Sequence, residues 1–503
     1  MKVEYICHAC LLIETEDLKI VTDPWFNGSA YCDQWHVFPK PVNTAALEDA
    51  DVILLSHGHE DHMHEPTLQL LPKSAQVMCQ YSFFGGSKEF IESLGFAEVR
   101  EAVAHKKYQL SPKTSVTFLI NSHDSIMVIE SGGKVLVNAN DALHSYPKKV
   151  IDFFIGEIKA NWQNIDMLFC GFGGAGYFPN MMHLEGKDDY ETGIVREQLF
   201  AHNFCHVTAE LRPKVAVPFA ADFALLADEQ RWINHARFPR AKMSRYYQRH
   251  FGANGFQPEI YDMYPGDILE TDELKKLSPY RAEMRDDGSL EHLIDEQYKE
   301  EIAALQAETS LSESEADKLS GEILQNVEKR MALYGIEKLR SLKFCLEVTD
   351  VPEQNIYNIA FVDDTPKVWR SGTSQEDALL TMRLPSKILR YSLESDWGAD
   401  VVNIGYGAEI DISSARAAEV DLERICMQLL ACYPTIKGTL KKAPLRSLKF
   451  MVGNSPKYTR SVKKLKQLNV ESENYDRKLW LLKDPDEIRK IYELPELDAE
   501  FLS

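Results

Sequence analysis

The sequence is short of positive charge, cysteine, long apolar stretches and internal repeats, and these shortages exclude several classes of protein. Its 56 Lys and Arg residues are outnumbered by 77 Asp and Glu residues, which gives a formal net charge of −21. A protein that binds nucleic acid or anionic membranes with its whole surface needs the opposite sign. We therefore do not expect nucleic acid to be a partner of the chain as a whole.

Cysteine is scarce as well, with nine residues spread over 503 positions. An odd, widely spaced set favours a reducing compartment over a disulfide-stabilised secreted protein. The N-terminus shows no signal-like apolar region. The longest apolar runs, such as Val52–Leu55, are far shorter than the ~18 residues of a membrane span. We predict a cytoplasmic, soluble protein without a transmembrane segment.

The chain is too long for a single hydrophobic core, so several domains are expected. Residues 1–265 alternate β-rich runs with segments of helical spacing, which predicts a layered α/β domain. The expected strands are Leu11–Glu14, Leu18–Thr22, Asp51–Ser56, Ser115–Asn121, Ile126–Glu130, Lys134–Asn138, Met167–Gly171 and Lys214–Phe219. The longer segments Glu185–Cys205 and Asp228–Gly252 are expected to be helical.

The composition changes after residue 265. Residues 266–335 predict an acidic helical connector, and residues 336–436 predict a small α+β domain. Residues 437–503 form a basic segment and a C-terminal tail, and Lys437–Lys466 contains ten Lys and Arg but no Asp or Glu. That segment predicts either an anionic partner or a solvated face that pairs with the protein's own acidic surface.

The run Ser56-His57-Gly58-His59-Glu60-Asp61-His62 predicts a metal site. It follows the apolar run at 51–55, so its side chains are expected on a loop that leaves a buried strand. Imidazole and carboxylate groups are the usual donors for zinc, iron and manganese. His57 and His59 can chelate one ion while Asp61 and His62 turn toward a second. The alternative, a loop that is merely solvated, is disfavoured by the density of donors.

This His-x-His-x-Asp-His pattern resembles the signature of the metallo-β-lactamase superfamily, and three separate places agree with it. Asp23, in Val21-Thr22-Asp23-Pro24-Trp25, matches the family's early strand-end Asp. His123 matches its third His ligand, and Asp141 matches its bridging Asp. The resemblance implies an αββα sandwich in the first domain, followed here by the connector and the small α+β domain.

The resemblance also implies one or two divalent metal ions, iron or zinc, with manganese as a further candidate. It places three imidazoles on the first ion, an Asp–His pair on the second and one carboxylate between them, namely His57, His59 and His123, Asp61 and His62, and Asp141. Asp61 and Asp141 are accordingly the expected catalytic carboxylates. Asp23 would hold a ligand imidazole in the required tautomer, with an ordinary strand-end Asp as the alternative.

The sequence departs from the family at the last metal ligand. The family's final His follows a late strand, where this chain has Val217-Pro218-Phe219-Ala220-Ala221-Asp222. The second ion therefore lacks one ligand unless Asp222, His183 or another group substitutes. Otherwise the second ion binds weakly, the site works with one ion, or an open position serves the chemistry.

Three segments, Asp23–Trp25, Gly173–Pro179 and Pro218–Ala220, are similar to the CMP-N-acetylneuraminate hydroxylase family, which also lacks the last His. That resemblance implies an iron-dependent hydroxylase of a polar, anionic small molecule. Because the family's Rieske module has no match here, the electrons would come from a separate protein.

Two other hypotheses about the function stay open. The Gly173–Pro179 loop is also similar to N-acylphosphatidylethanolamine phospholipase D, which implies metal-dependent hydrolysis of a phosphodiester, ester or lactone. A binding protein with a degenerate site is the non-enzymatic alternative. The small domain is similar to sterol-carrier-type modules, which would hold an apolar ligand or mediate dimerisation.

Overall fold

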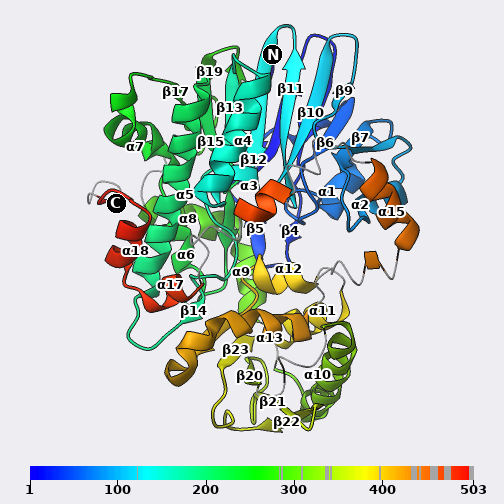
Figure 1. The fold of residues 1–503 in the computed structure, drawn as a ribbon, viewed down its shortest axis with the longest axis vertical. Helices are drawn as coiled ribbons and strands as arrows, with labels where there is room; N and C mark the ends of the chain where they lie inside the picture. Colours follow the sequence, from blue (N-terminus) through cyan, green and yellow to red (C-terminus); the bar gives the residue numbers. More distant parts are fainter. Residues whose placement is uncertain are drawn as a thin grey trace.

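The computed structural model describes residues 1–121, 123–281, 284, 287–307, 310–334, 339, 342–395, 398–431, 439–440, 443–453, 463–468 and 477–497. Two large sheets pack face to face, with helices on both outer sides (Figure 1). This arrangement is the αββα sandwich that the sequence predicts. A smaller α/β unit lies below the sandwich in Figure 1.

The first sheet has eight strands in the order β19-β18-β1-β2-β3-β6-β7-β8. They are β1 Lys2–Cys7, β2 Cys10–Glu14, β3 Lys19–Thr22, β6 Val52–Leu55, β7 Gln76–Gln80, β8 Val99–Ala102, β18 Ile268–Glu270 and β19 Glu273–Lys275. Strands β3, β6, β7 and β8 run parallel, so their carboxyl ends share one edge of the sheet. Helices α1 Glu65–Leu70 and α2 Ser87–Ser93 contribute to the core on its outer face.

The second sheet has seven strands in the order β17-β15-β13-β12-β11-β10-β9. They are β9 Lys107–Gln109, β10 Thr114–Asn121, β11 Asp124–Ser131, β12 Lys134–Asn140, β13 Met167–Gly171, β15 Val215–Phe219 and β17 Glu259–Ile260. Its outer face is covered by α3 Asp141–His144, α4 Lys148–Asn161, α5 Asp189–Leu211 and α7 Met243–His250. Strands β12, β13 and β15 are parallel.

The alternation of side chains along a strand explains why the sheets are covered on both faces. In β6, Val52 and Leu54 enter the core between the two sheets, while Ile53 and Leu55 enter the core on the helix side. All four side chains are buried. Burying one such side chain stabilises the fold by ~1.5–3 kcal/mol. Burial on both faces of the sheet explains why the apolar run in the sequence is uninterrupted.

A short third sheet, with the order β16-β5-β4, lies beside the edge where the parallel strands end. Its strands are β4 Ser29–Ala30, β5 Trp35–Val37 and β16 Phe223–Leu225. The segment predicted as one helix over 228–252 is divided into α6 Trp232–Ala236, a 3₁₀ turn at Arg240–Lys242 and α7. Pro239 at the break explains the division, because proline disfavours a helical residue before it.

The connector region serves both domains. Although the first domain was expected to end at residue 265, β18 and β19 continue its first sheet. Helices α8 Asp287–Gln297 and α9 Lys299–Gln306 follow, and they share a core with Phe38 and Leu226 of the first domain. Helix α10 Glu313–Tyr334 packs instead against the small domain.

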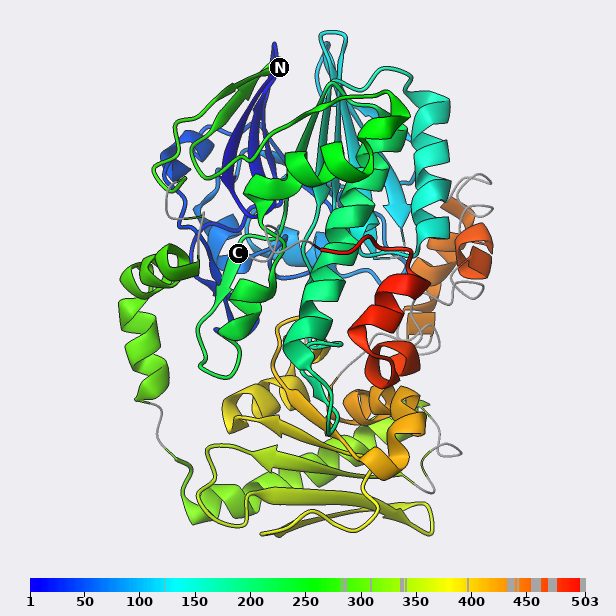
Figure 2. The same ribbon diagram turned by 90° about the vertical axis from the view of Figure 1, so that its left-hand side faces the viewer.

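The small domain is built on a six-stranded sheet with the order β14-β24-β23-β20-β21-β22 (Figure 2). Its own strands are β20 Lys343–Val348, β21 Ile356–Val362, β22 Thr365–Ser371, β23 Leu380–Leu384 and β24 Glu409–Ile412. The edge strand β14, Met182–His183, comes from the first domain and pairs parallel with β24. Its helices include α11 Ser386–Glu394, α12 Gly398–Asn403 and α13 Glu423–Leu430, the last preceded by a 3₁₀ helix at Ser414–Leu422.

The C-terminal part returns to the first domain. Helices α17 Arg477–Leu482 and α18 Pro485–Ile491 lie beside α5 (Figure 2), where Trp480 and Ile488 share a core with Val195. Much of the basic segment Lys437–Lys466 lies outside the described residues. In its helix α15, Pro444–Gly453, Arg446 pairs with Glu89 and Glu101 at 3.0 and 2.6 Å. None of the described helices combines the length and apolar character that a membrane span requires.

Candidate metal centre

The predicted ligands gather at one edge of the sandwich. The loop Ser56–His62 leaves the carboxyl end of β6, and Asp23 follows the adjacent parallel strand β3. Across the interface between the sheets, Asp124 begins β11 and Asp141 follows β12. Because these strand ends meet at the same edge, side chains far apart in the sequence face one another. This is the place where α/β folds commonly build their sites.

The first donor group contains His57, His59 and Asp124. One ligand atom from each lies within 4.8 Å of the others. The Nε2 atom of His57 is 2.8 Å from Nδ1 of His59 and 3.7 Å from Oδ1 of Asp124. Two imidazoles and a carboxylate of this kind suit a divalent transition metal.

His123, the expected third imidazole, is not a member of this group, although it is near enough to help lower the pKa of His57. The groups of potential ligands found among the described residues include Asp124 rather than its neighbour His123. The His123 ring is exposed and stacks on Phe84, with ring centroids 5.8 Å apart. His123 is in the turn before β11 and Asp124 is the first residue of that strand, and of the two it is Asp124 that lies 3.7 Å from Nε2 of His57.

The second donor group contains His8, Asp61 and His62. Oδ2 of Asp61 lies 3.0 Å from Nε2 of His8 and 3.3 Å from Nε2 of His62. Tyr31 also donates its hydroxyl to Asp61. All three members of the group are buried.

Asp141 connects the two groups. Together with His57 and His62 it forms a third set of ligand atoms within 4.8 Å, and its Oδ2 is 3.2 Å from Nε2 of His62. The other nitrogen of that imidazole, Nδ1, faces Oδ2 of Asp23 at 3.3 Å. Asp23 is itself fixed, because its Oδ1 accepts a hydrogen bond of 2.7 Å from the Ser56 amide. His62 is therefore held between carboxylates on both sides, which orients its ring.

The charges around His62 favour a cation at this position. Burial lowers the pKa of His62, but Asp61, Asp141 and Asp23 outweigh it and hold the pKa well above its usual range. Burial raises the pKa of Asp61, yet His62 and His8 hold it well below its usual value. Burial, followed by the neighbouring imidazoles, lowers the pKa of His57 well below 6.5. His57 is therefore neutral, which is the form in which an imidazole binds a metal, whereas the carboxylates around His62 hold a positive charge there that a bound cation would replace.

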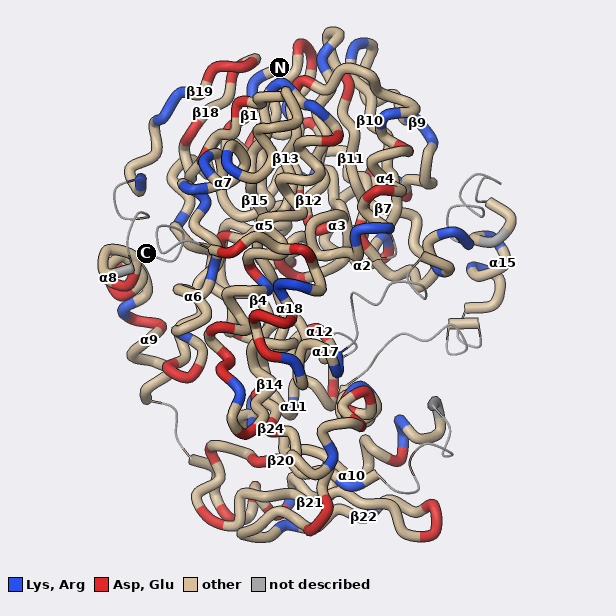
Figure 3. The backbone as a smooth tube through the Cα atoms, turned by 60° about the vertical axis from the view of Figure 1, so that its left-hand side comes forward, with Lys and Arg blue, Asp and Glu red and all other residues tan. Residues whose placement is uncertain are grey.

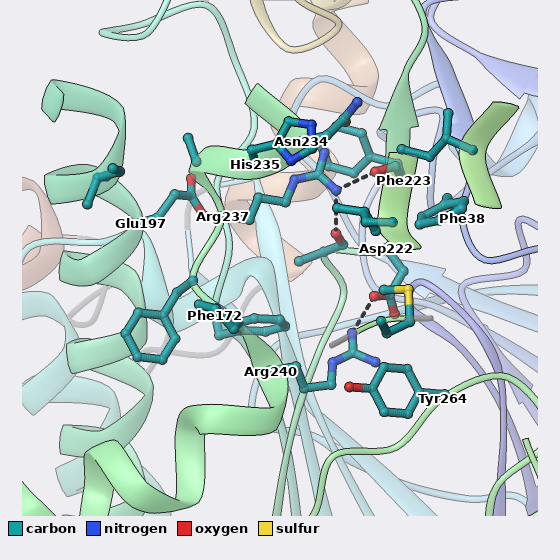
Figure 4. Close-up of a pocket in the computed structure, with 18 of the residues that line it drawn as sticks. Phe38, Phe172, Glu197, Asp222, Phe223, Asn234, His235, Arg237, Arg240 and Tyr264 are labelled. Carbon is teal, nitrogen blue, oxygen red and sulfur yellow. Dashed lines mark hydrogen bonds and ion pairs between the residues drawn. The ribbon is translucent and has the colours of Figure 1, made fainter. Parts of the chain in front are cut away.

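The two candidate substitutes for the missing last His lie elsewhere. Asp222 is paired with Arg240 and accepts a hydrogen bond from Tyr5, in a separate cavity (Figure 4). His183 is in β14, where its Nδ1 lies 2.6 Å from Asp189. Neither belongs to the groups of potential metal ligands in the described chain.

His8 lies beside the loop in which the family's last His is expected. It is in the turn between β1 and β2, with a positive φ of 45°. Its carbonyl accepts a hydrogen bond of 3.2 Å from the Ala220 amide, in the loop after β15 where the family's final His is expected. The Nδ1 atom of His8 is buried and has no hydrogen-bond partner among the described residues. The imidazole thus approaches the second group from another strand turn.

A cavity of about 190 Å³ opens onto these groups. Its walls include His59, Asp61, Asp124 and Asp141 on the metal-binding side. The remaining wall is mostly aromatic, glycine-rich or basic and includes Trp35, Phe223, Gly173–Gly176, Arg196, Asn403 and Ile404. Because Asn403 and Ile404 precede β24, the small domain contributes to the wall of the cavity.

Residues 2–152 match the family model described as "Beta-lactamase superfamily domain". This stretch resembles a β-lactamase superfamily domain, and we call the αββα sandwich that contains it the β-lactamase domain. The cytidine monophosphate-N-acetylneuraminic acid hydroxylase of Danio rerio is 24% identical over 247 residues, which are 46% of this chain and 39% of that protein. A Mycobacterium tuberculosis protein (strain ATCC 25618 / H37Rv) named as a Rieske 2Fe-2S iron–sulfur protein is 25% identical over 247 residues, 46% of either chain.

The matches thus span less than half the length of these relatives. Among solved structures, the diiron β-hydroxylase CmlA from Streptomyces venezuelae is 18% identical, with a TM-score of 0.37 over 55% of this chain and 54% of that one. A likeness this distant carries no conclusion about the reaction of this β-lactamase domain.

Two members of these donor groups, Asp124 and His8, were not among the predicted ligands. Asp124 could have been considered, because it is the immediate neighbour of His123. His8 had no local signal, because Cys7-His8-Ala9-Cys10 resembles the continuation of a strand. Its proximity to Asp61 follows from the order of strands in the first sheet, which places the β1–β2 turn beside the carboxyl ends of β3 and β6.

Proposed function

We propose that the β-lactamase domain holds two divalent metal ions. His57, His59 and Asp124 would bind the first ion, and Asp61, His62 and His8 the second, with Asp141 between them. The observation that carries this proposal is the position of Asp141, whose carboxylate forms a donor set with His57 of one group and His62 of the other. Four imidazoles and three carboxylates are enough for two sites that each keep an open position.

The leading function is hydroxylation of a polar, anionic small molecule with electrons from a separate protein. One support is the names of the two curated relatives, a hydroxylase and a Rieske iron–sulfur protein. The other is the presence of three carboxylates, because a site of mixed carboxylates and imidazoles suits iron better than a site of imidazoles alone. Hydroxylation of a C–H bond by O₂ consumes two electrons and two protons and releases one water. A redox protein must supply those electrons, which is why a separate donor belongs to the proposal.

Metal ions of this kind supply dioxygen activation when they are iron, or a bound water of lowered pKa when they are zinc. The chain's own residues prepare the site for either chemistry. Asp23 fixes the ring orientation of His62 through Nδ1. Trp35 and Phe223, both buried, exclude water from one wall of the cavity. Arg196, on another wall, offers a positive charge to an anionic substrate.

Metal-dependent hydrolysis of a phosphodiester, ester or lactone is the second candidate. The observation that favours it is the match to a family model named after a hydrolase. The same imidazole and carboxylate donors bind zinc. In this case the small cavity would hold the scissile bond, and Arg196 would bind the leaving anion.

Purification of the full chain without oxygen, followed by metal analysis, separates the two candidates. Two irons per chain, together with reductant-dependent consumption of O₂, would support the hydroxylase and exclude the hydrolase. One or two zincs with turnover of bis(p-nitrophenyl) phosphate would do the reverse. Bound metal with neither activity toward a broad panel would favour a binding protein.

A further inference from the structure

A second and larger cavity adjoins the metal centre. Its volume is about 700 Å³, and it lies between the β-lactamase domain and the C-terminal helices α17 and α18. Five residues line both cavities, namely Ser145, Ala175, Gly176, Arg196 and Asn403. The two spaces are therefore neighbours that share one wall, although none of the potential metal ligands lines the larger cavity itself.

The wall of this larger cavity is rich in cationic side chains, three of which also face carboxylates outside the lining: Lys148 faces Asp152, Arg196 faces Glu197 and Arg477 faces Glu423. Five cationic side chains line it, namely Lys148, Lys149, Arg196, Arg424 and Arg477, whereas Glu493 is the single carboxylate among its described lining residues. The whole protein carries a formal charge of −21, and acidic residues are widely distributed over the chain in Figure 3. A concave basic wall in an acidic molecule focuses a positive potential that attracts anions.

Two of the cationic side chains in this wall are buried arginines, so its positive charge does not come from surface lysines alone. Arg196 and Arg477 are only 7% and 8% exposed. Arg477 donates from Nη2 to Glu423 and Tyr177, both at 2.7 Å, while its buried Nε has no hydrogen-bond partner among the described residues. A buried guanidinium N–H without a partner is costly unless a ligand or water accepts its hydrogen bond.

Helix α4 adds a second source of positive potential. Its first residues, Lys148 and Lys149, and the preceding Pro147 line the cavity. The helix has no side-chain cap at its N-terminus and no acidic residue in its first turn. The free N–H groups and the helix dipole at such an end favour an anion.

We propose that this basic cavity binds the phosphate or carboxylate group of a small-molecule substrate. Phe178, Phe200 and Trp480 also line it and would contact an uncharged ring or chain attached to that group. The rest of the molecule would extend past Arg196 to the metal centre. That last step rests on the proposed function, whereas the anion site itself depends on this cavity alone.

Titration calorimetry with two non-hydrolysable probes tests the anion site. Phenylphosphonate and phenylacetate would be titrated into the full chain at low ionic strength, before and after removal of metal by a chelator, with benzyl alcohol as the neutral control. Binding of phenylphosphonate alone indicates a phosphate ligand, and binding of phenylacetate alone indicates a carboxylate ligand. Binding that persists without metal and weakens as ionic strength rises supports the basic cavity.

Variants localise the binding. K149Q and R196Q should weaken the favoured probe, R196Q by ~10-fold or more because a charge-assisted hydrogen bond is lost. K159Q is the matched control, because Lys159 lies on the same helix, pairs with Glu210 and does not line the cavity. Arg196 is buried, so K149Q, an exposed substitution, keeps the test valid if R196Q does not fold.

Equal binding by the parent, K149Q and K159Q, or loss of binding when metal is removed, would overturn the proposal. Its failure is distinct from failure of the proposed function. If the variants weaken anion binding but the protein neither consumes O₂ nor hydrolyses a substrate, the anion site is supported and the proposed enzymatic activity is excluded. If the protein shows turnover while the variants leave anion binding unchanged, the activity is supported and the anion site is excluded.

Discussion

Individual donor residues determine how many ions the centre can hold. His8 is one example, because it supplies an imidazole from a turn near the start of the chain, where the late strand supplies none. We expect His8→Ala to retain one tightly bound metal and to weaken the second by at least ~10-fold, as loss of a supporting group commonly does. Metal analysis after dialysis against a graded chelator measures this. His105→Ala, outside the donor groups, is the control, and an unchanged second metal in His8→Ala would exclude His8 as a ligand.

A second prediction at the scale of residues concerns which of the neighbours Asp124 and His123 binds the first metal. The family resemblance implies His123 as a ligand, whereas the geometry groups Asp124 with His57 and His59. Asp124→Asn should therefore lower the affinity for the first metal by ~10–100-fold, while His123→Ala should bind metal like the parent. Competition with a chromogenic chelator gives both affinities. The reverse pattern would restore the assignment based on the family.

The elements of the fold were largely predictable, because their signals are local. The apolar run Met167–Gly171 is β13 with the same bounds, and the donor loop after Val52–Leu55 leaves a strand as expected. Both follow from burial of strands on two faces. The contribution of His8 and the insertion of β14 into the small domain's sheet depend on contacts between distant parts of the chain. No spacing in the sequence encodes such contacts.

Two glycines give predictions at the scale of elements, one beside the cavity and one on the exposed face of a helix. A Cβ atom on Gly174 would lie 2.5 Å from Cε2 of Phe200 and 2.7 Å from Cζ of Arg196. Gly174→Ala should displace the Arg196 guanidinium and reduce anion binding, while the metal content stays unchanged. In α4, Gly156 is exposed and has open space around it, so Gly156→Ala should stabilise the protein by about 0.5–1 kcal/mol. Calorimetry and denaturant unfolding measure the two effects, and equal anion binding in both variants would contradict the first.

At the scale of the whole molecule, one buried ion pair joins three parts of the chain. Glu423 of α13 accepts hydrogen bonds from Arg477 of α17 and from Tyr177 in the loop after β13. Its carboxylate is fully buried. Burial raises the pKa of Glu423, and Arg477 opposes that rise. The small domain, the C-terminal helices and the β-lactamase domain are thus held together beside the basic cavity.

Glu423→Gln tests this junction, because it keeps the shape of the side chain and leaves Arg477 as a buried cation without its counter-charge. Breaking one side of such a pair costs ~3–5 kcal/mol, so we expect a lower unfolding temperature and weaker anion binding as α17 shifts. The double variant Glu423→Gln/Arg477→Met removes the stranded charge and should recover part of the stability but not the binding. Thermal unfolding and calorimetry on the same samples separate the two effects. If Glu423→Gln alone left both unchanged, the ion pair would not be what holds this wall of the cavity in place.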